Sequence, residues 1–165
     1  MVLDMTDVNE IKQEMIWKFK GKQIMWKYPQ MGKRENVIWS YFLTYIPWDD
    51  IEEIWYAVRV GPPYVPVDEL EDPLKRVFVA ATTLRIDAVV WRKAEVWIME
   101  VKEVGNVVAI GQLVSYQHYF LQEYPVKKPV YLGLVCEDYK KSIEPVAKRY
   151  GITIFKVKPW GIEIV

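Results

Sequence analysis

Hydrophobic and polar residues alternate along several short segments of the chain, a pattern typical of strands. Residues 51–60, IEEIWYAVRV, predict a strand that ends at a Gly-Pro-Pro sequence. Residues 14–29 alternate on both sides of a Lys-Gly-Lys turn, so we expect an N-terminal β-hairpin there. Residues 61–83 follow no clear period, and we expect a loop-rich insertion.

Apolar residues recur at intervals of three and four in two other segments, which predicts amphipathic helices over residues 34–45 and 106–124. A proline follows the second segment and ends it. Residues 129–136 have the continuous apolar character of a buried strand. A short helix capped by Ser142 and a last strand over residues 152–157 complete the pattern.

The predicted core order is helix, three strands, helix, strand, helix, strand. Strands that alternate with helices favour an α/β fold with a mixed central sheet flanked by helices. At 165 residues, the chain is expected to form a single domain, 1–165. We expect residues 1–33 to be an N-terminal hairpin extension and residues 34–157 to be the core.

The composition, 52% apolar and 27% charged, is that of a globular protein. With 22 basic and 22 acidic residues, the chain has no net charge that would attract nucleic acid or an anionic membrane, so a local patch must supply any such binding. The candidate basic residues for a patch are Lys20, Lys22, Lys33, Arg34 and Arg85. Cys136 is the only cysteine, which excludes an intrachain disulfide and a cysteine-based metal cluster.

The first residues, MVLDMTDVNEIKQ, lack the basic and then apolar order of a signal peptide. No apolar run in the sequence approaches the roughly 18 residues that span a bilayer. We therefore expect a cytoplasmic protein without a membrane partner.

Two acidic residues interrupt apolar runs in residues 85–103, RIDAVVWRKAEVWIMEVKE. If Trp91 and Val96 close a tight turn, Asp87 lies opposite Glu100 on the neighbouring strand. Their Cβ atoms would then be roughly 5 Å apart. Two carboxylates at such a short distance must share a proton, pair with a positive charge or hold a cation.

The same register places two basic residues near the acids. Lys102 shares a face with Glu100, because side chains two residues apart lie on one side of a strand. Arg85 would lie opposite Lys102. Oxygen ligands suit Mg²⁺ or Mn²⁺, and such an ion promotes hydrolysis of a phosphodiester by activating a water molecule. The alternative interpretation is a cross-strand ion-pair patch on a solvent-facing surface.

The order of these residues resembles the PD-(D/E)XK nuclease superfamily in its RecB-like branch. In that branch, an Asp begins the second core strand, a Glu-x-Lys closes the third, and the next helix carries Gln-x-x-x-Tyr. The matching residues here are Asp87, Glu100-Val101-Lys102, Gln112 and Tyr116. The resemblance covers residues 34–157 and implies a restriction-endonuclease-like core.

The resemblance implies a role for each matching residue. Asp87 and Glu100 would ligate Mg²⁺ or Mn²⁺, with the Val101 carbonyl as a third ligand. Lys102 would activate the attacking water, and Gln112 would assist it.

The resemblance also implies contacts with DNA and a further acid. Tyr116 would position the DNA backbone, and Arg85 would belong to the DNA-binding surface. Glu35, at the start of the first core helix, best matches the additional acid of the family, although a Glu in a first turn also simply favours the helix dipole. Glu10 and Glu14 match that acid less well.

We therefore expect a metal-dependent nuclease, a Mg²⁺-dependent deoxyribonuclease that hydrolyses DNA phosphodiester bonds through a metal-activated water. The main alternative is a non-cleaving nucleic-acid-binding or assembly module on the same fold. A Holliday-junction resolvase would share the acids and the lysine. The sequence leaves open whether the chain forms a homodimer.

Overall fold

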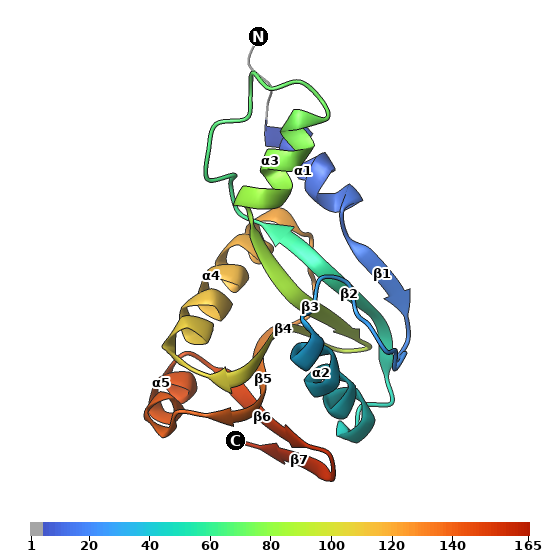
Figure 1. Ribbon diagram of the computed structural model, residues 1–165, viewed down its shortest axis with the longest axis vertical. Coiled ribbons are helices and arrows are strands. Elements are labelled where there is room, and N and C mark those ends of the chain that lie inside the picture. Colours follow the sequence, from blue (N-terminus) through green and yellow to red (C-terminus); the bar gives the residue numbers. More distant parts are fainter. Residues whose placement is uncertain (1–4) are drawn as a thin grey trace.

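A computed structural model describes residues 5–165 of the chain, and it is an α/β structure built on one mixed sheet with helices on both faces (Figure 1). The strands are β1 (Trp17–Lys20), β2 (Ile51–Val60), β3 (Leu84–Arg92), β4 (Val96–Gly105), β5 (Val130–Tyr139), β6 (Ile152–Lys158) and β7 (Gly161–Ile164). The helices are α1 (Met5–Glu14), α2 (Lys33–Tyr45), α3 (Leu74–Thr82), α4 (Val107–Glu123), α5 (Glu144–Arg149) and a 3-10 turn at Lys141–Ile143.

The seven strands lie in the sheet in the order of the sequence. Strands β1, β2, β3 and β4 pair with one another in antiparallel fashion. Strand β5 is parallel to β4, and β6 is parallel to β5. Strand β7 returns antiparallel along β6. Each parallel pair is joined by a helix, as parallel pairing requires a crossover: α4 joins β4 to β5, and α5 joins β5 to β6.

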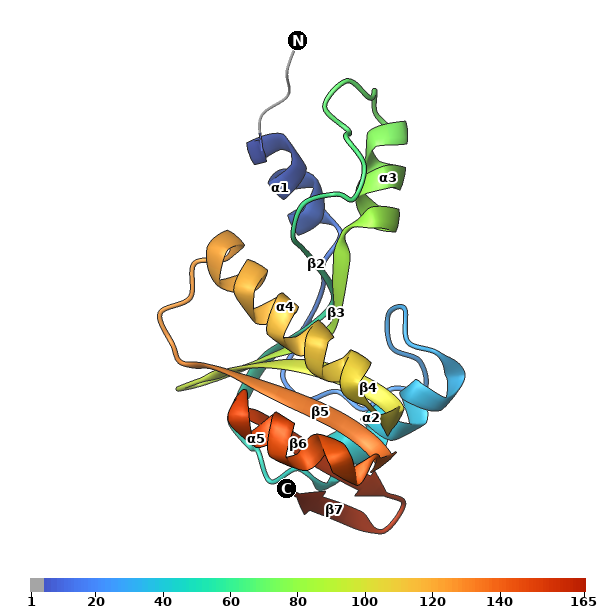
Figure 2. The same ribbon diagram turned by 90° about the vertical axis from the view of Figure 1, so that its left-hand side faces the viewer.

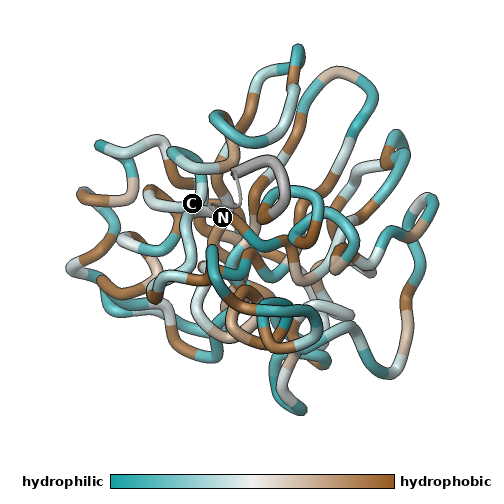
Figure 3. Tube along the Cα trace, turned by 90° about the horizontal axis from the view of Figure 1, so that it is seen from above, coloured by the Kyte–Doolittle hydropathy of each residue, from teal (hydrophilic) through white to brown (hydrophobic). Residues whose placement is uncertain are grey.

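Each face of the sheet carries its own hydrophobic core. Helices α4 and α5 cover one face and α2 covers the other (Figure 2). Leu113 and Phe120 of α4 are fully buried in the first core, and Trp39 and Phe42 of α2 are fully buried in the second. Hydrophobic and hydrophilic residues alternate along many segments of the trace (Figure 3), as helices with one buried face require.

Helices α1 and α3 pack against one another beyond the ends of β2 and β3, at the top of Figure 1. Val8 and Ile11 of α1 meet Val67 and Val79 in a small separate core. No helix within residues 5–165 has the length and apolar character needed to cross a membrane.

The central part of the sequence prediction is confirmed. The expected strand 51–60 is β2, and the expected helices 34–45 and 106–124 are α2 and α4. The tight turn between β3 and β4 gives the expected register, in which Trp91 pairs with Val96 and Ala88 pairs with Met99.

The predicted N-terminal β-hairpin is wrong. Only its first half is a strand, β1, and β1 pairs with β2. After Gly21, whose φ is 68°, the chain does not turn back along β1. Met25 and Tyr28 instead cover α2, where Ser40 contacts the Met25 carbonyl at 3.3 Å and the Tyr28 hydroxyl at 2.8 Å. The apolar spacing of residues 22–29 therefore reflects packing on a helix.

Three further differences concern short elements. The insertion 61–83 contains α3, a helix of nine residues that is stabilised by its contact with α1. Ser142 does not cap α5, whose N-cap is Ile143 without a side-chain hydrogen bond. Strand β7 follows a turn at Pro159 and Trp160 that was not anticipated. Residues 1–4 of the predicted extension lie outside the described residues.

Candidate active site

Two buried carboxyl groups meet where the β3–β4 ladder ends. The last paired residues are Ala88 and Met99, and Asp87 and Glu100 occupy the next position on each strand. Asp87 is 8% exposed and Glu100 is 4% exposed. The two carboxyl groups are neighbours, close enough that each affects the pKa of the other.

The backbone of β2 changes its pleat directly opposite Asp87. The β2–β3 register places Ala57 across from Asp87, and Ala57 has a φ of 55°. Before this point, Tyr56 lies in the core under α2, whereas Val58 lies in the core under α4. Residues two apart on a regular strand share a face. Tyr56 and Val58 lie on opposite faces, so the alternation of side chains along β2 is interrupted at Ala57.

The alternation of side chains along β3 is interrupted at the matching position. Ala88 lies in the core under α2, whereas Ile86 lies in the core under α4. Asp87, between them, accepts a hydrogen bond of 2.8 Å from the Val101 backbone N–H of β4. If the β3–β4 pairing continued, the Val101 N–H would bond to the backbone of β3. It bonds to the Asp87 carboxylate instead, and this contact holds Asp87 beside Glu100.

The environment of the pair disfavours two negative charges. Burial raises the pKa of Asp87, although the hydrogen bond from Val101 opposes this shift. Burial, and then the neighbouring Asp87, raises the pKa of Glu100 to about 9. Near neutral pH the pair therefore holds a proton unless a cation takes its place.

Lys102 lies beside the pair, as the strand pattern predicts. Its Nζ is 3.7 Å from Glu100 Oε1, and its side chain is 30% exposed. The predicted pairing of Arg85 with Lys102 is wrong, because the ladder stops at Ala88 and Met99. Arg85 instead donates to the Gln30 side chain at 2.5 Å, while its charge lowers the pKa of Asp87.

Helix α4 contributes the side chains that cover the pair. Asn106 caps the helix by accepting the N–H groups of the next turn at 3.1 and 3.3 Å. Tyr116 is 3% exposed, and after burial the neighbouring Glu100 is the next cause that raises the pKa of its hydroxyl, so the two side chains lie close together. Gln112 lies one turn earlier on the same helix face. Tyr116 therefore lies beside Glu100, and its predicted contact with the DNA backbone stays a prediction.

Glu35 lies in the first turn of α2 and also faces this region. Its carboxylate accepts the Gly32 backbone N–H at 3.1 Å, which stabilises the start of the helix. The same charge raises the pKa of Asp87, so Glu35 is close enough to act on the pair. Its contact with Gly32 supports a structural role, and its catalytic role stays a prediction.

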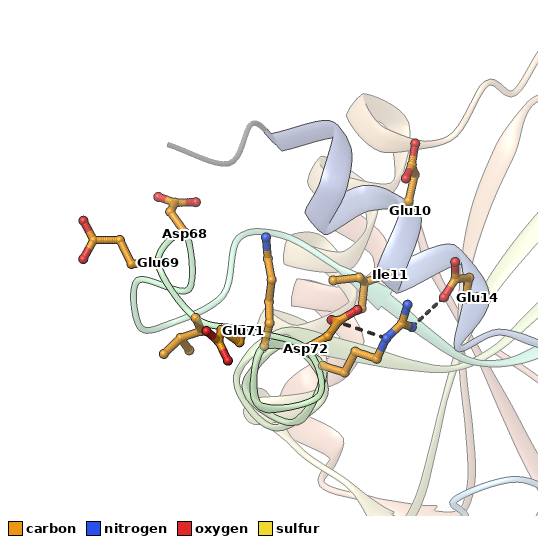
Figure 4. Close-up of a pocket in the computed structure, with 10 residues that line it drawn as sticks. Glu10, Ile11, Glu14, Asp68, Glu69, Glu71 and Asp72 are labelled. Atoms are coloured by element: carbon orange, nitrogen blue, oxygen red, sulfur yellow. Dashed lines mark hydrogen bonds and ion pairs between the residues drawn. The ribbon is translucent and has the colours of Figure 1, made fainter. Parts of the chain in front are cut away.

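The weaker candidates Glu10 and Glu14 lie elsewhere, on α1. They line a cavity of about 570 Å³ that faces α3 and the loop before it (Figure 4). Glu14 forms an ion pair with Arg76, which also contacts Asp72. These acids therefore take no part in the Asp87–Glu100 site.

The oxygen atoms around the pair fit a divalent cation. No group of three or more His, Cys, Asp or Glu side chains that could hold a metal occurs within residues 5–165. Glu100 Oε2 and Gln112 Oε1 are nevertheless buried and have no hydrogen-bond partner in the described chain. Such buried, unsatisfied oxygens are costly. These two oxygens, Asp87 and the Val101 carbonyl are of the oxygen type that Mg²⁺ and Mn²⁺ prefer, and they are the atoms that could hold such an ion here.

Sequence reasoning missed Ala57, Arg59 and Gln30. An alanine in an apolar strand carries no signal of an unusual φ. Arg59 interrupts the buried end of β2, and a charged residue in such a run was a usable signal. Gln30 lies just beyond the predicted hairpin 14–29, in a loop whose contacts the sequence pattern did not predict.

Comparison with protein-family models, with curated proteins and with solved structures found no match to this chain.

Proposed function

We propose that this protein is a metal-dependent nuclease that hydrolyses DNA phosphodiester bonds on a restriction-endonuclease-like core. The observation that carries the proposal is the buried Asp87–Glu100 pair, with Lys102 at its edge. Two adjacent carboxyl groups inside a sheet cost considerable free energy of desolvation. Buried acids with shifted pKa values are concentrated at the active sites of proteins.

The acids and neighbouring oxygens would hold the cation. Asp87 and Glu100 are the charged ligands, and the Val101 carbonyl is the neutral one. When bound, Mg²⁺ or Mn²⁺ would lower the pKa of a water molecule and neutralise charge that develops on the phosphate. Val101 donates its N–H to Asp87, so the same peptide segment orients one acid and offers its carbonyl.

The remaining side chains would orient the reactants. The Lys102 side chain is 30% exposed, so its ammonium can reach both a phosphate oxygen and the attacking water. Gln112 Oε1 lacks a partner and can accept a hydrogen bond from that water. Tyr116 lies close to Glu100, and its hydroxyl would help to orient the Glu100 carboxyl.

The second candidate is a nucleic-acid-binding or assembly module that does not cut. Two observations favour it: only two carboxyl groups are in contact at the site, and the chain has no net charge. A protein of this kind would bind through a local basic surface.

An assay of DNA cleavage separates the two candidates. The purified protein would be incubated with linear and closed circular duplex DNA, single-stranded DNA and RNA, each with Mg²⁺, Mn²⁺ or EDTA. Cleavage of DNA that requires the metal supports the proposal, and cutting of closed circles identifies an endonuclease. Binding without cleavage under every metal condition supports the non-cleaving module.

A further inference from the structure

Two guanidinium groups meet at a single neutral acceptor near the proposed active site. Arg59 Nη2 donates to Gln30 Oε1 at 3.1 Å, and Arg85 Nη1 donates to the same oxygen at 2.5 Å. Arg59 and Arg85 are direct partners in the β2–β3 ladder, which brings their side chains together. Like charges at such close range repel one another unless an anion lies between them.

Within residues 8–165, the protein supplies no such anion. No carboxylate of this part of the chain forms an ion pair with Arg59 or Arg85. Arg59 is only 8% exposed, and its Nε is buried without a hydrogen-bond partner. Burial and the Arg85 charge both lower the pKa of Arg59, which is consistent with an uncompensated positive site. Buried guanidinium groups are ordinarily paired, so this pair lacks its counter-ion.

A cavity of about 400 Å³ lies beside Arg59 and Gln30, the acceptor that Arg85 shares. Trp17 of β1 and Ala80 of α3 also line it. Glu14 also borders the cavity, but its carboxylate is bound to Arg76. The cavity therefore offers room for a small anion next to unpaired donors.

We propose that Arg59, Arg85 and Gln30 form a phosphate-binding site that is distinct from the Asp87–Glu100 pair and that holds a second phosphate of the nucleic-acid substrate. The guanidinium fork matches two oxygens of a phosphate, and the Gln30 amide N–H₂ can donate to a third. As a statement about substrate, the inference rests on the proposed nuclease function.

The position of the site relative to the acids suits a nucleic-acid strand. Arg85 precedes Asp87 by two residues on β3, which is about 6.6 Å along a strand. Arg85 also lies close enough to Asp87 for its charge to lower the pKa of Asp87. A strand with one phosphate at Asp87 would place a neighbouring phosphate near the arginine pair. That phosphate is either an internal phosphodiester or the terminal phosphomonoester of a cut strand.

The substitution Gln30→Glu tests the site without removing an arginine. A carboxylate at this position would pair with both guanidinium groups and occupy the place of the anion. We expect Gln30→Glu to raise the melting temperature in the absence of phosphate. In wild type, inorganic phosphate with EDTA should raise the melting temperature above that in chloride of equal ionic strength, and Gln30→Glu should remove this increase.

Two further variants keep this test interpretable. Arg85→Gln should reduce the effect of phosphate, whereas Arg149→Gln, at an exposed arginine of α5, should leave it unchanged. An equal phosphate effect in wild type and Gln30→Glu would overturn the proposal, and so would the lack of any phosphate effect in wild type.

Oligonucleotide binding identifies the source of the phosphate. In EDTA, the affinity of wild type and Gln30→Glu would be compared for one linear strand with a 5′-phosphate, a 3′-phosphate or hydroxyl ends. A terminal site gives about tenfold tighter binding of one phosphorylated end, and Gln30→Glu removes this preference. An internal site gives about tenfold weaker binding of all three strands by Gln30→Glu. Equal affinities in both proteins would refute the site. This binding assay contains no metal, so it does not depend on cleavage. If the protein binds in this way but never cuts DNA, the phosphate site stands and only the nuclease function is disproved.

Discussion

The carboxylate of Asp87 accepts a 2.8 Å hydrogen bond from the backbone N–H of Val101, the residue that follows Glu100. This bond joins the two acid-bearing strands at the point where their backbone pairing stops. It holds Asp87 against Glu100 although burial raises the pKa of both groups. The contact therefore stabilises an arrangement that the electrostatics of the pair oppose.

Replacement of Asp87 separates the hydrogen bond from the charge. Asp87→Asn keeps an oxygen that can accept the Val101 N–H and removes the charge, so we expect it to fold at least as stably as wild type near neutral pH. Asp87→Ala leaves that buried N–H without a partner, so it should be about 1–2 kcal/mol less stable than Asp87→Asn. Urea unfolding measures the difference, and equal stability of the two variants would mean that the bond contributes nothing.

The raised pKa of Glu100 makes stability depend on pH. Its pKa is about 9 in the folded protein against an ordinary value of 4.5, so folding takes up a proton between these values. Stability from this group is complete below about pH 4.5 and is lost as the pH rises towards 9. Glu100→Gln removes this loss, so the variant should gain about 1–3 kcal/mol over wild type at about pH 8 and little at about pH 5.

The matched control for this measurement is Glu103→Gln. Glu103 lies on the same strand but is exposed, so its replacement should leave the pH dependence unchanged. A constant difference between wild type and Glu100→Gln from about pH 5 to about pH 8 would contradict the assigned protonation of the pair.

Metal binding should compete with the shared proton. We expect Mg²⁺ to raise the melting temperature of wild type more at about pH 8 than at about pH 6, because fewer protons must be displaced at the higher pH. Glu100→Gln should remove this increase. Differential scanning fluorimetry with and without EDTA measures both effects, and a Mg²⁺ effect that persists in Glu100→Gln would place the ion elsewhere.

The unusual backbone at Ala57 should limit substitution there. A φ of 55° strains any residue with a branched Cβ, so Ala57→Val should lower the free energy of unfolding by at least about 2 kcal/mol. Ala57→Gly relieves the strain but loses a buried methyl group, so its effect should stay within about 1 kcal/mol. If urea unfolding found Ala57→Val as stable as Ala57→Gly, the left-handed conformation would be refuted.

The sequence predicted the part of the site that regular geometry determines. The tight turn between Trp91 and Val96 sets the β3–β4 register, and that register brings Asp87 to Glu100. The alternation of side chains then places Lys102 beside Glu100. These relationships follow from local periodicity and need no knowledge of distant contacts.

The rest depends on contacts between segments far apart in the sequence. The face reversal at Ala57 has no signature in residue type, and the apolar residues after Gly21 pack on α2 although their spacing resembles that of a strand. Gln30 reaches Arg59 and Arg85 only because the loop before α2 folds against β2 and β3. Long-range packing of this kind overrides local pattern.

The central claim is that the Asp87–Glu100 pair and Lys102 carry out metal-dependent cleavage of DNA. The most direct measurement compares the cleavage rates of wild type, Asp87→Asn, Glu100→Gln, Lys102→Ala and the control Glu103→Gln in Mg²⁺, with DNA affinity measured in EDTA. We expect each site variant to lose at least about 100-fold in rate. The two acid variants should keep or slightly gain affinity, Lys102→Ala should bind slightly more weakly, and Glu103→Gln should match wild type. Cleavage at the wild-type rate by both Asp87→Asn and Glu100→Gln would contradict the claim.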